Sequence, residues 1–180
     1  MGLLASLRLG PRRDRLDRLP AIETDRLRIA PLLPEDAAAL QALTDDPAIT
    51  AAVDFLPDRF RIEDARGLIG SGQRGRDVFL GVRGREDPAL LGVVGTHLRA
   101  SAAVEIGYWM GGAARGRGYA AEAVGAVVRT LARAYPRRLL VAECRPQNEA
   151  SSGLLRKLGF EDTGEDGHRP GRRVFVWRGP

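Results

Sequence analysis

The stretch 111–120, which reads GGAARGRGYA, holds the residues whose types and spacing point most directly to chemistry. It joins a segment of strand character to a long helical pattern, so its last residues begin a helix. A helix start offers backbone N–H groups without partners and the positive end of the helix dipole. Glycines let an anion approach the backbone closely, and Arg115 and Arg117 can add charge-assisted hydrogen bonds. The loop therefore suits a pyrophosphate.

Two common phosphate motifs do not match this loop. It lacks the Gly-Lys-Ser/Thr of a Walker A loop. Gly116 and Gly118 have the first spacing of a dinucleotide fingerprint, but a series of strands precedes them rather than the start of a βαβ domain. A flexible strand-to-helix connection with incidental arginines remains the alternative.

The elements that must position this loop can be read from hydrophobic periodicity. Alternation predicts strands over 24–30, 78–82, 89–96, 104–110, 139–144 and 174–177, the last after a turn-rich segment over 164–171. Helical spacing predicts helices over 35–43, 62–71, 119–135 and 149–158. Helices and strands do not alternate strictly. We therefore predict an α+β fold with a mixed, mostly antiparallel sheet, about four helices and one parallel crossover over 104–144.

Length and composition exclude several classes of protein. The 180 residues are 44% apolar, which suits one globular domain, and we place it over 21–180 after a basic extension over 1–20. No apolar run approaches a membrane span, and the N-terminal residues lack the apolar segment of a secretory signal, so we expect a cytoplasmic protein. The single Cys144 excludes a disulfide framework. His97 and His168 lack ligand spacing, so no metal site is expected.

The net charge of +5 raises the question of nucleic acid. Residues 1–20 hold five arginines and two aspartates, or +3, which leaves +2 for the remaining residues. Only 6% of residues are aromatic and they do not interleave with arginine, so no nucleic-acid partner is expected. We interpret 1–20 as a non-catalytic extension that is solvated or docked on a partner. An arginine-rich arm that contacts RNA is the alternative.

Several segments together resemble one family. Arg115-x-x-Gly118-x-Ala120 resembles the Arg/Gln-x-x-Gly-x-Gly/Ala motif of the GNAT superfamily of N-acetyltransferases. The preceding EIGYWM (105–110) and the later NEASSGLLRKLGF (148–160) resemble the strand and the Asn-x-x-Ser…Leu-Gly-Phe segment of that family. TDRLRI (24–29) followed by PED (34–36) resembles its RimJ/RimL-type branch, whose named members acetylate N-terminal amines of ribosomal proteins. The resemblance covers residues 22–178.

This resemblance implies a site. Strands 104–110 and 139–145 would splay apart and hold the pantetheine arm of acetyl-CoA, with the pyrophosphate on the amides of 115–120. The acceptor amine would enter from the opposite side, over the helices within 30–70 and the C-terminal hairpin. A homodimer is plausible for the family, and no metal or membrane is implied. The implied cofactor-binding residues are Trp109, Met110, Arg115, Gly116, Arg117, Gly118, Tyr119, Ala120 and Asn148.

Acetyl transfer needs a neutral amine, and free amines are mostly protonated at pH 7. A carboxylate in the cleft can remove the proton, and Glu105 is our candidate base, with Glu143 a weaker one. A surface strand residue paired with Arg99 is the other interpretation of Glu105. A backbone N–H near 109–111 would stabilise the oxyanion. Many family members protonate the leaving thiolate with a tyrosine, but the corresponding Leu154-Leu155 is apolar here.

Ser151 is the substitute acid that the RimJ/RimL-type pattern implies, and a helix-capping hydroxyl is its other interpretation. The sequence thus predicts transfer of an acetyl group from acetyl-CoA to a primary amine, by direct attack in a ternary complex. The acceptor would be a protein N-terminus or a small molecule. A catalytically inactive acyl-CoA-binding regulator with the same fold is the alternative.

Overall fold

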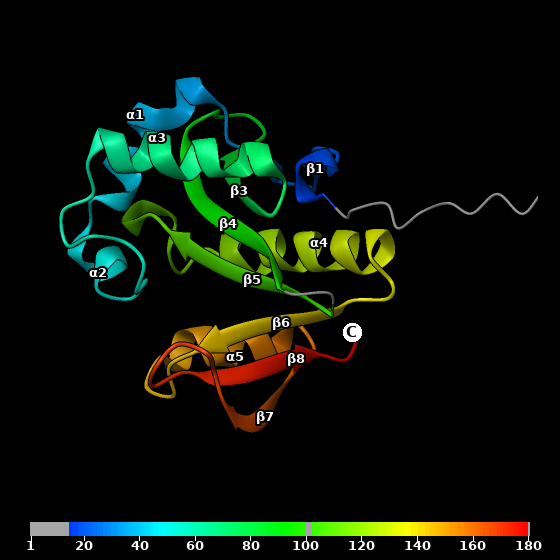
Figure 1. Ribbon diagram of the computed structural model, residues 1–180. Coiled ribbons are helices and arrows are strands. Elements are labelled where there is room, and N and C mark those ends of the chain that lie inside the picture. The colour runs from blue at the N-terminus through cyan, green and yellow to red at the C-terminus, as the bar shows by residue number, and fades with distance from the viewer. Residues whose placement is uncertain (1–14, 100–101, 180) are drawn as a thin grey trace, which may run out of the picture.

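The structure, a computed structural model, describes residues 15–99 and 102–179 and is built around one sheet (Figure 1). Its strand order is β1-β2-β3-β4-β5-β6-β8-β7, and every neighbouring pair is antiparallel except β5–β6. The α+β fold with a mixed, mostly antiparallel sheet is therefore confirmed. The strands are β1 (Ile22–Glu23), β2 (Leu27–Pro31), β3 (Asp77–Gly84), β4 (Leu90–Arg99), β5 (Ala103–Met110), β6 (Leu139–Cys144), β7 (Phe160–Asp166) and β8 (Arg173–Trp177).

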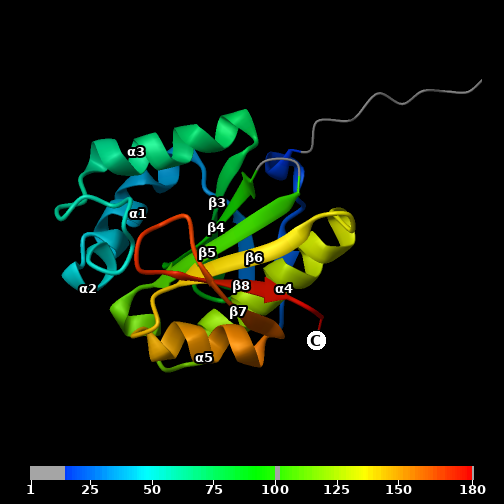
Figure 2. The same ribbon diagram turned by 60° about the horizontal axis from the view of Figure 1, so that its bottom comes forward.

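Helices cover both faces of the sheet. The described α-helices are α1 (Ala37–Thr44), α2 (Pro47–Thr50), α3 (Ile62–Ser71), α4 (Tyr119–Ala134) and α5 (Glu149–Lys157). Figures 1 and 2 show α1 and α3 on one side of the sheet and α4 on the other, with α5 below β6 and β8 in Figure 2. None of the described helices combines the length and apolar character that a bilayer crossing requires.

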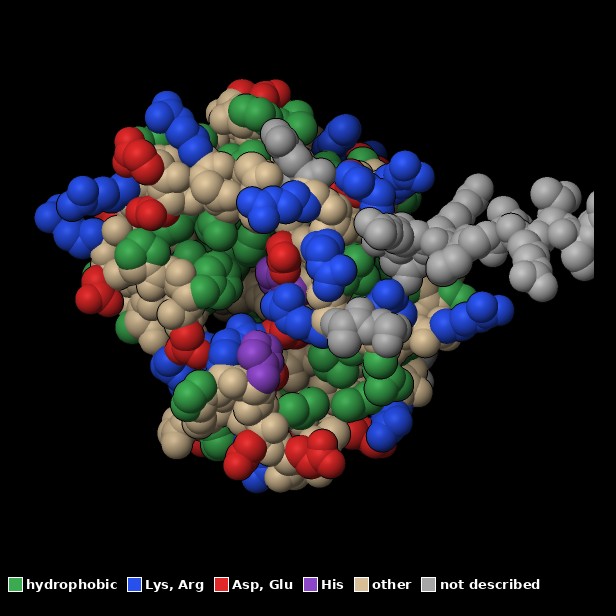
Figure 3. Space-filling view, viewed as in Figure 1, with side chains coloured by type: hydrophobic (Ala, Val, Ile, Leu, Met, Phe, Trp, Pro, Cys, Tyr) green, Lys and Arg blue, Asp and Glu red, His purple; other side chains and the backbone are tan. Residues whose placement is uncertain are grey.

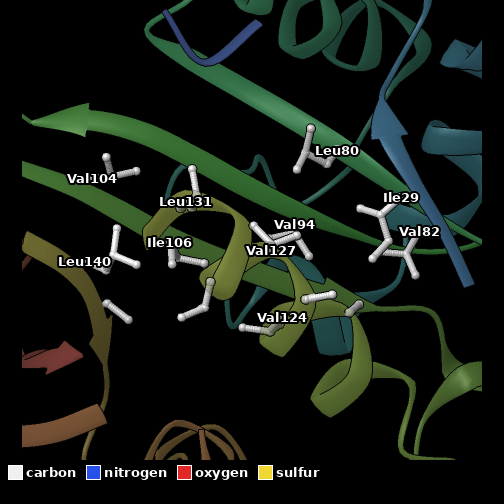
Figure 4. Packing of buried hydrophobic residues seen from close by; sticks show 14 of the residues in the cluster. Ile29, Leu80, Val82, Val94, Val104, Ile106, Val124, Val127, Leu131 and Leu140 are labelled. Atoms are coloured by element: carbon white, nitrogen blue, oxygen red, sulfur yellow. The ribbon is translucent and has the colours of Figure 1, made fainter. Parts of the chain in front are cut away.

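Strand alternation divides the core into two clusters. On the α4 side, Val124, Val127 and Leu131 of α4 pack against strand residues such as Val94 and Ile106 (Figure 4). On the other side, α1 and α3 cover a second cluster that contains Leu40, Phe60, Phe79, Val93 and Trp109. Because successive strand residues point to opposite faces, β5 contributes to both clusters.

The start of the domain differs from the expected boundary at residue 21. Leu16 is fully buried, Leu19 is nearly so, and the Leu16 N–H donates to the Gly75 carbonyl at 2.8 Å. Leu16–Arg18 forms a 3₁₀ helix whose apolar residue completes the core beside β3 and β4. The domain therefore includes the last residues of the predicted extension. The first 14 residues of the extension, which hold most of its arginines, lie outside the described residues.

A strand was also missed near the C-terminus. The turn-rich interpretation of 164–171 overlaps β7, which pairs with β8 to form a hairpin. Apart from Phe160, every residue of β7 is exposed, so the strand carries no apolar alternation for the sequence to reveal. Its loop therefore begins only after Asp166.

The parallel pair β5–β6 opens along its length. Ladder pairing joins only Ala103 to Leu139, Val104 to Leu140 and Glu105 to Val141. The remaining residues of β5 pair with β4 alone, and those of β6 pair with β8 alone. The strands therefore separate after Glu105, as the predicted splay requires.

Candidate active site

A cavity of about 460 Å³ occupies the opening between β5 and β6. Its lining runs from Arg115 and the first residues of α4 at one end to Glu105 and Glu143 at the other. Residues from both faces of the sheet line it, including Trp109 from the α1 and α3 side and Tyr108 from the α4 side. One continuous space thus connects the glycine-rich loop with the two candidate carboxylates.

The glycine-rich loop has the backbone shape of an anion site. Gly116 and Gly118 have φ values of 72° and 78°, a left-handed conformation that other residues rarely adopt. Gly118 is the N-cap of α4, and the first amide bonded within the helix is that of Glu122. The amides of Tyr119, Ala120 and Ala121 precede it and so have no partner within the helix. They are available to a ligand at the cavity end.

The two loop arginines are held differently. Arg115 donates from Nε to the Met110 carbonyl at 3.1 Å and pairs with Asp46 at 3.1 Å. The Arg117 guanidinium lies over the Tyr119 ring, 5.2 Å from its centroid, and Arg26 lies over the same ring at 4.7 Å. Only Arg115 of the pair lines the cavity.

Alternation along β5 settles the direction of Glu105, which the sequence left open. Glu105 shares its face with Trp109, whose Nε1 donates to Thr44 Oγ1 of α1 at 3.1 Å. Tyr108 and Met110 pack on the α4 side instead. The Trp109 side chain therefore lies on the face opposite α4, so any cofactor contact from the α4 side would use its backbone.

Glu105 is a buried carboxylate held by two arginines. It is 2% exposed, and Arg99 donates from Nε to its Oε2 at 2.6 Å. The Arg169 guanidinium, from the loop between β7 and β8, pairs with Oε1. The interpretation of Glu105 as a surface residue is therefore wrong, although its pairing with Arg99 is present. Burial is the main reason that the pKa of Arg169 is lowered.

Glu143 lies beside Glu105 across the β5–β6 pair and organises the β7–β8 loop. Its carboxylate accepts from Arg169 Nε at 3.0 Å and from the His168 N–H at 2.9 Å, and it also pairs with His168 Nδ1. Ligand atoms of Glu105, Glu143 and His168 lie within 4.8 Å of one another, which the sequence spacing of the histidines did not suggest. The guanidinium of Arg169 is the cation that joins the two carboxylates.

Arg172 ties the same loop to the opposite wall of the cavity. Its guanidinium pairs with Asp54 at 2.7 Å and donates to the Ala52 carbonyl at 2.8 Å. The Arg172 hydrogen bond is the main reason that the pKa of Asp54 is lowered. In Figure 2 the loop, drawn in orange to red, reaches from the β7–β8 hairpin toward α1 and α2. The loop thus closes one side of the cavity.

Two hydroxyl groups meet on the α4 side. The Tyr108 and Ser151 hydroxyls lie 2.8 Å apart, and both residues line the cavity. Burial raises the pKa of Tyr108 to about 12, while its hydrogen bond with Ser151 acts in the opposite direction. Asn148 caps α5 by accepting from the Ser151 N–H at 3.0 Å. Ser151 therefore takes part in the helix cap through its backbone amide, while its hydroxyl group is directed to Tyr108.

An apolar wall faces the charged residues. The rings of Phe55, Phe79 and Trp109 lie with centroids 6.1 to 6.3 Å apart, and Phe55 is 47% exposed. Figure 3, which views the α1 and α3 side, shows a hollow with hydrophobic side chains on one flank and charged ones on the other. This side of the cavity can contact an apolar group of a ligand.

The structure places Tyr108, Arg169 and Arg172, which were not among the predicted site residues, in contact with or beside the predicted Glu105 and Ser151. Strand alternation, combined with a fixed direction for Glu105, would have placed Tyr108 on the opposite face. No local signal identifies the partners of Arg169 and Arg172, because those contacts depend on the position of the β7–β8 loop.

The fold and the site together define an acyltransferase-type cleft: a split parallel strand pair with an anion-binding helix start at one end. The family model for the GNAT acetyltransferase domain matches residues 26–161. The chain therefore belongs to the GNAT acetyltransferases, in the RimJ/RimL-type branch, and is an N-acetyltransferase.

Individual relatives agree with this assignment. The chain is 30% identical over 151 residues to the uncharacterized N-acetyltransferase YoaA of Bacillus subtilis. The aligned residues make up 81% of this chain and 85% of YoaA. A GNAT-family acetyltransferase from Bacillus anthracis has a TM-score of 0.76 at 21% identity, covering 87% of this chain and 97% of that one. RimL, an α-N-acetyltransferase of ribosomal protein L7/L12 solved with coenzyme A, has a TM-score of 0.71 at 20% identity, covering 88% and 96%.

Proposed function

We propose that this N-acetyltransferase moves an acetyl group from acetyl-CoA to a primary amine by direct attack in a ternary complex. The observation that carries the proposal is the continuous cavity from the start of α4, through the opening after Glu105, to the two carboxylates. Direct transfer needs both substrates at one point, and a space open to both faces of the sheet allows them to enter from opposite sides. RimL, which shares the fold, has been solved with coenzyme A.

Acetyl-CoA would bind from the α4 side. Its pyrophosphate would lie on the free amides of Tyr119–Ala121, where Gly116 and Gly118 permit close approach. Its pantetheine amides would pair with the backbone of β5 at Trp109 and Met110, which lack a partner on the β6 side. Arg115 would add charge at the phosphate end. Asn148 would contribute by fixing the start of α5 and with it Ser151.

Glu105 would act as the base on the acceptor side. An ammonium group gives its proton to the Glu105 carboxylate, and the resulting neutral amine attacks the thioester carbonyl. A backbone N–H of the opened strand near 109–111 would stabilise the oxyanion. As the tetrahedral intermediate collapses, the C–S bond breaks, the nitrogen releases its second excess proton to solvent, and the CoA thiolate leaves beside an acetylated, neutral amide nitrogen.

Ser151 would serve the leaving thiolate on the cofactor side. Because Tyr108 keeps its proton at neutral pH, its hydroxyl can donate to Ser151 Oγ. The Ser151 O–H is then free to donate toward the sulfur. This chain of two hydroxyls takes the place of the tyrosine that Leu154 and Leu155 do not provide.

The acceptor in this proposal is a protein N-terminus or a small molecule that bears a primary amine. The decisive experiment is a screen of amine-terminated peptides and small amines, monitored by CoA release. Amine-dependent release with an acetylated product supports the proposal. Tight binding of acetyl-CoA with no amine-dependent release across the library would instead favour a regulatory protein without turnover.

A further inference from the structure

Arg169 places a positive charge between the two carboxylates where β5 and β6 part. Its Nη2 pairs with Glu105, and its Nε donates to Glu143 at 3.0 Å. Glu105 belongs to the last β5–β6 ladder pair, in which Val141 is its partner. Glu143 lies two residues beyond Val141 on β6, and both acids line the cavity. The protein itself therefore shows that this position accepts a cation bound to two carboxylates at once.

In this arrangement each oxygen of Glu105 is paired with a guanidinium group. Arg99 engages Oε2 and Arg169 engages Oε1. Because Glu105 is only 2% exposed, the Arg169 guanidinium occupies the approach to Oε1 that an ammonium group would need. One guanidinium must withdraw before Glu105 can act as a base.

The structure indicates which of the two can move. Arg99 belongs to the β4–β5 ladder and is also paired with Asp77 at 3.2 Å. Arg169 lies in the loop that connects Asp166 to its ladder partner Arg173, two residues before Gly171, whose φ is 72°. The Arg169 side chain is 24% exposed and that of Arg99 is 40% exposed, so the difference between them lies in their backbone settings, a ladder for Arg99 and a loop for Arg169. Because Arg172 anchors the end of the loop at Asp54, Arg169 can turn outward without release of the whole loop.

We propose that the Arg169 guanidinium occupies the position between Glu105 and Glu143 that the ammonium group of the acceptor takes during the reaction. Binding of the acceptor then displaces Arg169 from this position. The proposal rests on the function proposed above. The incoming ammonium replaces one cation by another, so neither buried carboxylate is left without a counter-charge. The ammonium then transfers one proton to Glu105, and the neutral amine attacks the thioester. The overall balance is ammonium plus acetyl-CoA giving acetamide, CoA thiol and one released proton.

Without an acceptor, the same contact protects the thioester. A free Glu105 can remove a proton from water as well as from an amine, and water would then hydrolyse acetyl-CoA. Arg169 prevents this while it occupies Glu105. The hydrolysis rate in the absence of any amine is therefore a direct measure of the contact.

The test compares amine-free hydrolysis of acetyl-CoA in the unaltered chain, Arg169→Gln and Arg169→Lys. Arg178→Gln is the matched control, because Arg178 pairs with Glu161 on the far side of the hairpin. We expect R169Q to raise hydrolysis several-fold, R169K to remain near the unaltered rate, and R178Q to have no effect. The double variant E105Q/R169Q should return to the unaltered rate. Unchanged or slower hydrolysis in R169Q that still binds acetyl-CoA would overturn the proposal.

A second measurement uses the unaltered chain and so does not depend on the folding of a variant. Butylammonium should speed amide hydrogen exchange over 167–171 but not over 119–134, whereas butanol, which has the same apolar tail and no charge, should change neither. Equal exchange with and without butylammonium would overturn the displacement. Failure of the unaltered chain to bind acetyl-CoA at all would instead overturn the proposed function.

Discussion

Glu105 and Tyr108 lie three residues apart on β5 and point to opposite faces of the sheet. Glu105 contacts arginines on the side of α1 and α3, and Tyr108 contacts Ser151 of α5 on the side of α4. The proposed base for the acceptor and the proposed hydroxyl chain for the thiolate thus lie on opposite sides of the strand. Both line the one cavity that passes between β5 and β6.

Replacing Glu105 by Gln should lower kcat/KM for the acceptor by about 10²-fold or more, since this is the usual range for loss of a general base. The loss should be greatest at low pH, where the neutral amine is scarce. Acetyl-CoA affinity should be unchanged, because we propose that acetyl-CoA binds on the opposite face of the sheet. Steady-state rates from pH 6 to 9 test this, and a profile that keeps its shape and height would show that Glu105 is not the base.

Tyr108→Phe and Ser151→Ala should each lower kcat by about tenfold if the hydroxyls act as one chain. Removal of either hydroxyl breaks the same path of proton transfer. The double variant should therefore lower kcat no more than the single variant with the larger effect. Rate measurements on the four proteins form the required cycle. Fully additive losses would mean that the two hydroxyls act independently.

Gly118→Glu should abolish CoA binding, because it brings a carboxylate to the start of α4, where we propose that the pyrophosphate binds. Any side chain at this position is strained by the φ of 78°, so Gly118→Ala is the matched control for strain alone. Titration calorimetry should give a small loss of CoA affinity for G118A and no detectable binding for G118E. Similar affinities for the two variants would contradict the assignment of this loop.

Leu16→Ala should reduce the free energy of unfolding by about 2–5 kcal/mol, the usual cost of removing a buried leucine side chain. Leu16 is fully buried although it precedes the expected domain boundary. Leu139→Ala is the control. Because Leu139 is 52% exposed, this substitution should change the free energy of unfolding little. Urea denaturation of both variants measures the difference, and equal costs would place Leu16 outside the domain.

His97 should make stability depend on pH. Burial lowers its pKa in the folded protein, and the hydrogen bond of Nδ1 to Asp77 only partly offsets this. Above about pH 6.5 the histidine is neutral in both states and contributes nothing. Below that pH the unfolded chain takes up the proton first, so the free energy of unfolding falls as the pH falls. His97→Gln should flatten this decline between pH 7 and 5 in thermal denaturation, and parallel curves would contradict the prediction.

Local patterns were sufficient for the elements that carry the cofactor side of the site. The apolar alternation of β5, the glycines at 116 and 118 and the apolar stripe of α4 each lie within one short stretch of chain. The acceptor side depends instead on contacts between distant segments. Arg169 reaches Glu105 and Arg172 reaches Asp54 only because β7 and β8 pair. That pairing could not be predicted from hydrophobic periodicity, because the residues of β7 after Phe160 are exposed.

The short β5–β6 ladder has a consequence for solubility. Beyond Glu105 each strand presents backbone groups with no partner across the opening, which makes two strand edges inside one sheet. Exposed edges promote association between chains, and proteins commonly cover them. Here α5 and the β7–β8 loop enclose these edges within a cavity. The chain can thus keep hydrogen-bonding groups ready for a ligand without offering them to another copy of itself.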